Sequence, residues 1–167
     1  ATLAMGDALA IALLESRGFN AQNFAELHPG GSIGKKLLLT LDQLIHTGDN
    51  IPFVNDNTKL KDALFIISEK GLGVTGVLNN HNKLIGIITD GDIRRGLEKG
   101  GNNIFDLTAK DLMSKNPKTI PSDTLALVAL ELMEKHNITS LFVYSSPDLV
   151  KPDGIVHIHD ILKTGVQ

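Results

Sequence analysis

Histidine, proline and two glycines stand together at positions 28–31, within the stretch HPGGSIGKK (28–36). A glycine-rich stretch that ends in Gly-Lys is typical of a phosphate-binding P-loop, which needs a glycine, four free residues and then Gly-Lys-Ser/Thr. Here Pro29 holds the place of the first glycine, and Lys36 follows where a hydroxyl residue is required. The spacing therefore argues against a nucleoside-triphosphate site. The reason for His28, which titrates near neutral pH, has to come from the rest of the chain.

A second polar group, Thr89-Asp-Gly-Asp92 followed by Arg94 and Arg95, comes directly after the apolar segment GII (86–88). Thr-x-x-Asp is the pattern of a helix capping box, so Thr89 and Asp92 are candidates for a purely structural helix start. The same helix start offers free N–H groups and partial positive charge to a phosphate. Asp92 is then a candidate acceptor for ribose hydroxyls, and the two arginines are candidates to pair with phosphate. Both readings stay open at this point.

The same pattern recurs once with a change. In GIVHIHD (154–160), Asp160 corresponds to Asp92, but His157 stands where Thr89 stands. We expect the hydroxyl cap to be lost there and the His157 imidazole to enter a cleft as a polar contact to a ligand. His157 and His159 would face the same side of a strand, but two histidines without a third ligand do not make a metal site, and we expect no metal. One strong site is expected, not two equal ones.

These polar groups belong to an internal repeat, the feature to seek first in any sequence. GIITDGDIRRGL (86–97) matches GIVHIHDILKTG (154–165) at an offset of 68 residues. In the middle of the repeat, 60–78 matches 125–143 at an offset of 65. We attribute the three-residue slips to loops of different length.

Each copy is expected to fold as β-α-β-β-α, because apolar residues recur at helical spacing and are followed by short β-rich runs. About 60 residues are marginal for independent stability, so two copies are expected to pack face to face around a shared core. The expected elements are extended stretches at 51–54 and 118–121, helices containing Leu60, Leu64, Ile67 and Leu125, Leu132, Met133, strands at 74–78, 84–89, 140–144 and 154–158, and short helices from about Asp92 and Asp160.

Composition narrows the class of protein. The 167 residues carry a net charge of −3 with both signs interspersed, which argues against a nucleic-acid or membrane partner. The chain has no cysteine, which excludes disulfides and thiolate chemistry. No apolar run approaches membrane-spanning length, so a cytoplasmic protein is expected. Because an apolar segment follows Ala1 at once, we expect the chain to be a piece of a longer protein.

The repeat resembles the cystathionine-β-synthase (CBS) domain pair, a ligand-sensing module. The resemblance covers about 42–165 and rests on Gly86-Ile-Ile-Thr89-Asp-Gly-Asp92 at the last strand–helix junction. It implies an α+β fold, a tandem CBS pair with a pseudo-twofold axis. The implied domains are a first repeat at 42–100 and a second at 109–167.

Residues 1–41 resemble a different unit. The run 2–19 is an apolar helix with Gly18 suited to end it, and Asn20 is suited to cap a short helix at 21–27. The order of MGDALA, HPGG, GKKLLL, HTGD and TDGDIRR is similar to that of the arabinose 5-phosphate isomerase family, in which a sugar-isomerase (SIS) domain precedes a CBS pair. The resemblance implies that 1–41 is the helical tail of an SIS domain with its linker.

The same resemblance gives His28 a role. The family interconverts ribulose 5-phosphate and arabinose 5-phosphate, and His28 would be an active-site acid or base on a tight backbone shaped by Pro29 and the glycines. The structural alternative is that His28 only closes the helix at 21–27. The phosphate cradle and the carboxylate base of such a site have no counterpart in this sequence, so we expect the chain by itself to be inactive.

Three functions therefore compete. The first is a sensing module of the isomerase that needs no cofactor and binds a regulatory nucleotide or CMP-Kdo, the activated form of a lipopolysaccharide sugar, in the CBS cleft. The second is a purely structural module whose repeats dimerise and organise an oligomer with empty clefts. The third is a nucleotide sensor of an unrelated protein. The expected partners of the first are a sugar phosphate, a nucleotide or nucleotide sugar, and further copies of the chain, as a CBS dimer and a tetramer in the whole enzyme.

Overall fold

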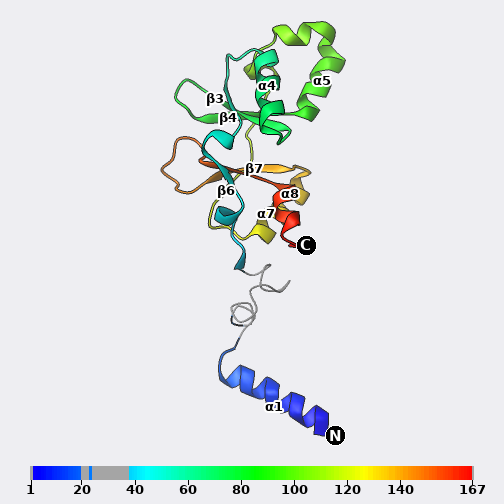
Figure 1. Ribbon diagram of the computed structural model, residues 1–167, viewed down its shortest axis with the longest axis vertical. Coiled ribbons are helices and arrows are strands. Elements are labelled where there is room, and N and C mark those ends of the chain that lie inside the picture. The colour runs from blue at the N-terminus through cyan, green and yellow to red at the C-terminus, as the bar shows by residue number, and fades with distance from the viewer. Residues whose placement is uncertain (1, 20–22, 24–37, 167) are drawn as a thin grey trace.

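The computed structural model describes residues 2–19, 23 and 38–166 (Figure 1). Its elements are α1 (Thr2–Ser16), η1 (Leu41–Gln43), β1 (His46–Thr47), η2 (Gly48–Asn50), β2 (Phe53–Asn55), α4 (Leu60–Lys70), β3 (Val74–Leu78), β4 (Leu84–Thr89), α5 (Asp90–Gly100), η3 (Gly101–Asp106), α6 (Ala109–Leu112), β5 (Ser114–Lys115), β6 (Thr119–Pro121), α7 (Ala126–His136), β7 (Ser140–Tyr144), β8 (Gly154–His157) and α8 (Ile158–Lys163).

Two four-stranded sheets form the body of the molecule, in the orders β2-β3-β4-β5 and β1-β8-β7-β6. Within each sheet a helix crosses between two parallel strands, α4 between β2 and β3 and α7 between β6 and β7, and an antiparallel hairpin follows. This is the expected β-α-β-β-α arrangement. Figure 1 shows the two sheets stacked, with helices on their outer sides. The α+β tandem fold predicted from the repeat is thereby confirmed.

The two repeats exchange their first strands, which the sequence did not indicate. β1 lies at the start of the first repeat but pairs with β8 of the second, and β5 lies at the start of the second repeat but pairs with β4 of the first. Each sheet is therefore completed by a strand from the other repeat. Because the exchanged strands hold only two residues each, few hydrogen bonds keep them in place.

In the structure, the middle of the first repeat (60–78) corresponds to residues one position later in the second repeat than the sequence match predicted. α4 and α7, like β3 and β7, are related by an offset of 66, so Leu60 corresponds to Ala126 and Val77 to Val143. The predicted offset of 65 is wrong, and the loops differ by two residues. In a strand a one-residue shift moves every side chain to the opposite face, so this register decides which residues are equivalent.

Local signals place the ends of the two long helices. The C-cap residues that follow α4 and α7 are Gly71 and Asn137. Both adopt the left-handed conformation, with φ of 69° and 52°. Glycine and asparagine are the residues that adopt this conformation most easily. The short helices begin two residues before the expected Asp92 and Asp160, at Asp90 and Ile158.

Apolar side chains fill three layers. One core lies between each sheet and its own helices, and a third lies between the two sheets. In the third core Phe142 of β7 is fully buried and stacks on Phe53 of β2, with ring centroids 5.5 Å apart. The repeats therefore share a core, as expected from their small size.

α1 lies on the run 2–19 that the sequence predicted as an apolar helix, and its large side chains are exposed. Met5 is 72% exposed and Leu9 is 63% exposed, and Ile11, Leu13 and Leu14 are also open to solvent.

The expected helix at 21–27 and the HPGG stretch with His28 lie outside the described residues. None of the helices in the described part of the chain combines the length and apolar character needed to cross a bilayer.

Candidate functional site

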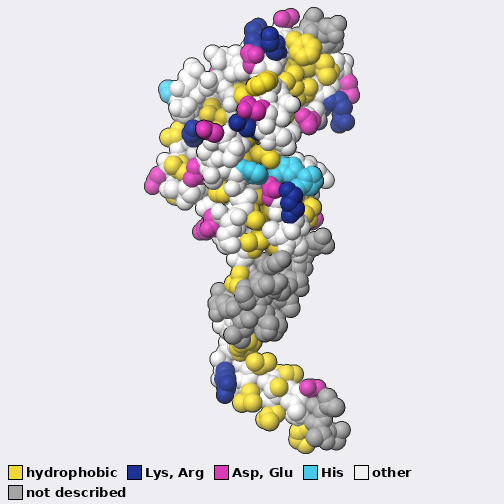
Figure 2. Space-filling model, in the orientation of Figure 1, with side chains coloured by type: hydrophobic (Ala, Val, Ile, Leu, Met, Phe, Trp, Pro, Cys, Tyr) yellow, Lys and Arg dark blue, Asp and Glu magenta, His cyan; other side chains and the backbone are white. Residues whose placement is uncertain are grey.

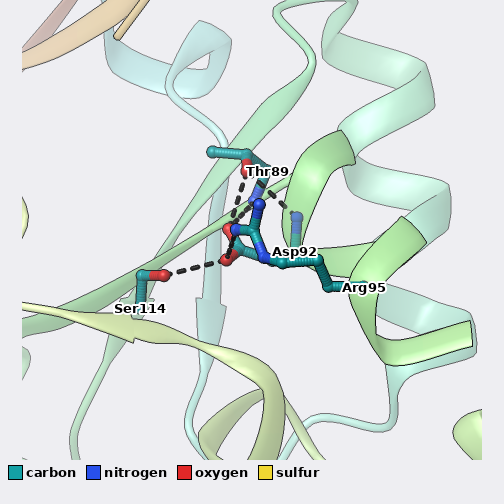
Figure 3. Close-up of polar contacts among 4 residues, drawn as sticks. All are labelled: Thr89, Asp92, Arg95 and Ser114. Atoms are coloured by element: carbon teal, nitrogen blue, oxygen red, sulfur yellow. Dashed lines mark hydrogen bonds and ion pairs between the residues drawn. The ribbon is translucent and has the colours of Figure 1, made fainter. Parts of the chain in front are cut away.

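The junction between β4 and α5 carries the first candidate site (Figure 3). Thr89 donates from its backbone N–H and its Oγ1 to Asp92 Oδ2, at 2.9 and 2.7 Å. The Asp92 N–H returns a bond to Thr89 Oγ1 at 3.3 Å. The reciprocal pair is a capping box, so the structural reading of Thr-x-x-Asp is correct.

The second carboxylate oxygen of Asp92 is also engaged. Arg95 Nη2 and Ser114 Oγ donate to Oδ1 at 2.7 and 2.8 Å. Burial alone raises the pKa of Asp92, but the bonds from Thr89, Ser114 and Arg95 hold that pKa below its usual value. A carboxylate accepts about four hydrogen bonds, so Asp92 has no acceptor position left for a ligand in this state.

Among the partners of Asp92, Arg95 is the one that can move away from the carboxylate. The Arg95 side chain is 58% exposed, whereas the Asp92 side chain is only 7% exposed. Arg94, the neighbouring candidate, is exposed and is not among the residues that line the adjacent cavity. Of the two arginines, the structure therefore brings only Arg95 to the site.

A cavity of about 480 Å³ opens beside this junction and lies between the two repeats. The first repeat supplies Thr89, Asp92 and Arg95, and the segment 114–118 and the end of α7 with the start of β7 supply the other walls. The lining residues are Val74, Ile87, Thr89, Gly91, Asp92, Arg95, Ser114, Lys115, Asn116, Pro117, Lys118, His136, Asn137, Ile138, Thr139 and Ser140.

Two features of this lining suit an anionic ligand that forms hydrogen bonds. Arg95, Lys115 and Lys118 outnumber the single carboxylate of Asp92. Ser140 is buried, and its Oγ has no hydrogen-bond partner among the described residues. A buried hydroxyl without a partner costs free energy that a bound polar group or a water would recover.

The second repeat carries an equivalent group of different chemistry. At an offset of 68, His46, His157, Asp160 and Lys163 correspond to Ser114, Thr89, Asp92 and Arg95. His46 Nε2 lies 2.8 Å from Asp160 Oδ2, and Lys163 Nζ donates to Oδ1 at 3.2 Å. Burial raises the pKa of Asp160, and the bonds from His46 and Lys163 bring that pKa below its usual value. This carboxylate is likewise engaged within the chain.

His157 caps α8 in place of the missing threonine. Its Nδ1 accepts a hydrogen bond from the His159 N–H at 3.2 Å, so the cap is replaced and not lost. β8 ends at His157, so His159 belongs to α8 and not to the strand. The rings of His157 and His159 contact edge to face, with their centroids 4.7 Å apart. His157 is not among the residues that line the cavity. In the described ranges, no three His, Asp or Glu side chains are placed to hold a metal ion.

A comparison with protein-family models identifies the family to which the two repeats belong. The model of the CBS domain matches residues 44–99 and again 109–166, which is more than half of the chain. This chain belongs to the CBS domain family. The Thr89–Asp92 junction falls within the first match, and the His157–Asp160 junction falls within the second.

Curated relatives extend the similarity beyond the CBS repeats. The chain is 46% identical over 165 residues to "Arabinose 5-phosphate isomerase KdsD" of Pseudomonas aeruginosa and 43% identical over 166 residues to the protein of the same name in Escherichia coli K12. Both alignments cover 99% of this chain. The chain spans about half the length of these relatives, 50% and 49%.

Solved CBS structures share the fold. A CBS-domain protein of Agrobacterium tumefaciens has a TM-score of 0.69 at 16% identity, over 77% of this chain and 95% of its own. The CBS domain pair of protein MJ0100, in complex with 5'-methylthioadenosine and S-adenosyl-L-methionine, has a TM-score of 0.65 at 23% identity, over 75% and 94%. CBSX2 in complex with AMP has a TM-score of 0.63 at 22% identity, over 76% and 96%.

The two junctions and the cavity contain residues that sequence reasoning missed: Ser114 at the first junction, His46 at the second, and Lys118 and Ser140 in the cavity wall. Ser114 and His46 sit on the exchanged strands, and the offset of 68 that relates Asp92 to Asp160 also relates these two residues. That offset was available in the sequence. No motif near Ser140 or Lys118 in the sequence indicates a binding site, because these residues reach the cavity only when the second repeat packs on the first.

Proposed function

We propose that this chain is the regulatory part of an arabinose 5-phosphate isomerase and that its inter-repeat cavity binds a nucleotide or nucleotide sugar. The cavity between the repeats, with the Thr89–Asp92–Arg95 junction in its wall, carries the proposal. The identity with the isomerases covers 99% of the chain and therefore includes residues ahead of 44, where the CBS match begins. A CBS module of an unrelated protein has no reason to share that segment.

The state of Asp92 limits the ligands that fit. A ribose hydroxyl can donate to Oδ1 only if Arg95 or Ser114 leaves that oxygen, since all its acceptor positions are used. A ligand phosphate offers Arg95 a replacement partner near the start of α5. A ligand that carries both an anion and hydroxyl groups is therefore favoured over a neutral nucleoside. The AMP complex of the CBS neighbour CBSX2 supports a ligand of this class.

Ligand binding in the cavity can be coupled to the rest of the chain, because both repeats line the cavity. A ligand there would contact both repeats and the exchanged strand β5, and so favour one packing of the repeats over another. The segment that enters from the N-terminal side docks on the second repeat, where Leu41 is fully buried and its N–H bonds to the Thr124 carbonyl at 2.9 Å. We propose that this anchor carries the change to the isomerase domain and that CMP-Kdo is the feedback ligand.

A thermal-shift screen tests the sensing role. A ligand present at 100 times its Kd stabilises the folded state by about 2.7 kcal/mol, which corresponds to a rise in Tm of roughly 5–10 °C for a domain of this size. We expect such a shift with at least one of AMP, ATP, CMP and CMP-Kdo, and none with the matching nucleosides. Arg95→Gln should lose the shift, and it should lower the Tm of the free protein only slightly, because the Arg95 side chain is 58% exposed. If no nucleotide moves the Tm, the module is structural and the sensing role is wrong.

The second prediction of the proposal concerns catalysis. In the proposed parent enzyme His28 acts as an acid or base on the sugar, while the phosphate cradle and the carboxylate base come from the half of the relatives that this chain does not match. The purified chain should therefore not convert ribulose 5-phosphate. Turnover within the ordinary enzyme range, about 1–10³ per second, in a coupled assay of arabinose 5-phosphate formation would contradict this assignment.

A further inference from the structure

Three histidines gather around Asp160, on the surface at the level where the two repeats meet. His46 comes from the exchanged strand β1, His157 ends β8, and His159 lies in the first turn of α8. Figure 2 shows histidine side chains beside acidic and basic ones on this face. The first repeat has no such group, because the positions equivalent to His46 and His157 are Ser114 and Thr89. Serine and threonine do not titrate, so only the second junction can change charge between about pH 5 and 8.

Charge at this junction depends on the protonation of His157. With His157 neutral, the formal charges of Asp160 and Lys163 cancel each other. A proton on His157 adds a positive charge to a group that already contains Lys163. Protonation therefore replaces a balanced group by a repulsive one.

Protonation also removes the cap of α8. His157 accepts the His159 N–H through Nδ1, which requires that this nitrogen carry no proton. An imidazolium has two donors and no acceptor, so the cap is broken by the same proton that adds the charge. The groups that face His157 are His46 from β1, Ser140 from β7, and His159, Asp160 and Lys163 from α8. Only Asp160 among them favours the protonated form.

We propose that this junction is a pH-sensitive clasp that holds β1 and the start of α8 on the second repeat near neutral pH and releases them on acidification. β1 is a suitable element to release, since it pairs with β8 through only two residues, His46 and Thr47. It also follows directly on the docked segment around Leu41, so the clasp controls how firmly the N-terminal segment is attached to the repeats. The clasp needs no ligand and is independent of the proposed sensing role.

The pKa of His157 agrees in direction with this geometry. Burial lowers that pKa, and the nearby His159, His46 and Lys163 lower it further against the opposing effect of Asp160. The folded state then binds a proton less readily than the unfolded state. The stabilisation is present above the unfolded pKa of about 6.5 and is lost as the pH falls below it.

Hydrogen–deuterium exchange of the whole 167-residue chain tests the clasp. Protection of the amides in β1 and α8, corrected for the intrinsic effect of pH, should fall severalfold between about pH 7.5 and 5.5. The amides of β3 and β4 are the internal reference and should stay protected. Unchanged protection of β1 and α8 over this range would overturn the proposal.

Three variants separate the clasp from general acid sensitivity. His157→Asn supplies a cap that does not titrate and should abolish the loss of protection at low pH. His157→Thr, which copies Thr89 of the first repeat, should do the same and serves if the first variant fails to fold. His81→Asn, on the exposed hairpin turn, should leave the wild-type pH response intact. A wild-type response in both His157 variants would also overturn the proposal.

Discussion

Asp92→Ala is expected to lower the free energy of unfolding by about 2–3 kcal/mol, because this one carboxylate closes a group of four residues. It caps α5 through Thr89, holds Arg95, and fixes the exchanged strand β5 through Ser114. Alanine leaves the Thr89 N–H without its partner and removes the bond from the Ser114 hydroxyl to the first repeat. Urea denaturation measured at neutral pH gives the change directly.

Asp160→Ala is the matched control. Its carboxylate also has side-chain partners, His46 and Lys163, but the Asp160 side chain is 21% exposed and Lys163 is 77% exposed, so water replaces much of what is lost. We expect a smaller loss, under about 1.5 kcal/mol. Equal losses in the two variants would mean that the Thr89 capping box adds nothing to the first junction.

The same pair of variants tests ligand binding. If Asp92 accepts a ribose hydroxyl after Arg95 moves to phosphate, Asp92→Ala should weaken nucleotide binding about ten- to hundred-fold, roughly 1.5–3 kcal/mol. Asp160→Ala should leave that affinity unchanged. Titration calorimetry separates the two functions of Asp92. A loss of stability with no loss of affinity would leave Asp92 as a helix cap only.

Gly86→Ala is expected to cost about 1–3 kcal/mol and to weaken the ligand site as well. A Cβ at Gly86 would overlap Met113 Sδ and would lie 2.9 Å from Met113 Cβ. The Sδ can rotate away, but the Cβ can move only with the backbone. Met113 directly precedes Ser114, so the shift would pull the Ser114 hydroxyl away from Asp92. Thermal melts and nucleotide titration should both show the loss.

Gly154→Ala makes the equivalent change in the second repeat. There a Cβ would lie 2.9 Å from Ile45 Cδ1 and 3.3 Å from Ile45 Cβ, next to the exchanged strand β1. We expect a similar or smaller loss of stability without any change in nucleotide affinity, because β1 does not line the cavity. If Gly86→Ala binds nucleotide as tightly as Gly154→Ala, then β5 does not shape the site.

Much of the fold was predictable because its signals are local. The strands 74–78, 84–89 and 140–144 have the predicted bounds, and Thr89 and Asp92 form the capping box that their spacing indicated. Each of these features depends on residues within a few positions of one another. The repeat itself was visible because the two junctions keep a common offset of 68.

The register in the middle of the repeat was predicted wrongly for a physical reason. Leu, Ile, Val and Met substitute for one another in a core, so the apolar pattern of 60–78 fits 125–143 almost as well as it fits 126–144. Hydrogen bonding between strands removes this ambiguity. Val74 pairs with Thr89, and Ser140 pairs with His157, which fixes the offset at 66.

Local spacing and residue identity are enough to establish the two repeats, their order of elements and the residue types at each strand–helix junction. Which residues meet depends on the tertiary structure. It brought Ser114 to Asp92 and His46 to Asp160 by exchanging strands between repeats, and it placed Ser140 in the wall of the cavity. These contacts join residues 22 and 114 positions apart or lie across the interface of the repeats. Contacts of that kind form only when the two sheets pack together and bury the core around Phe142.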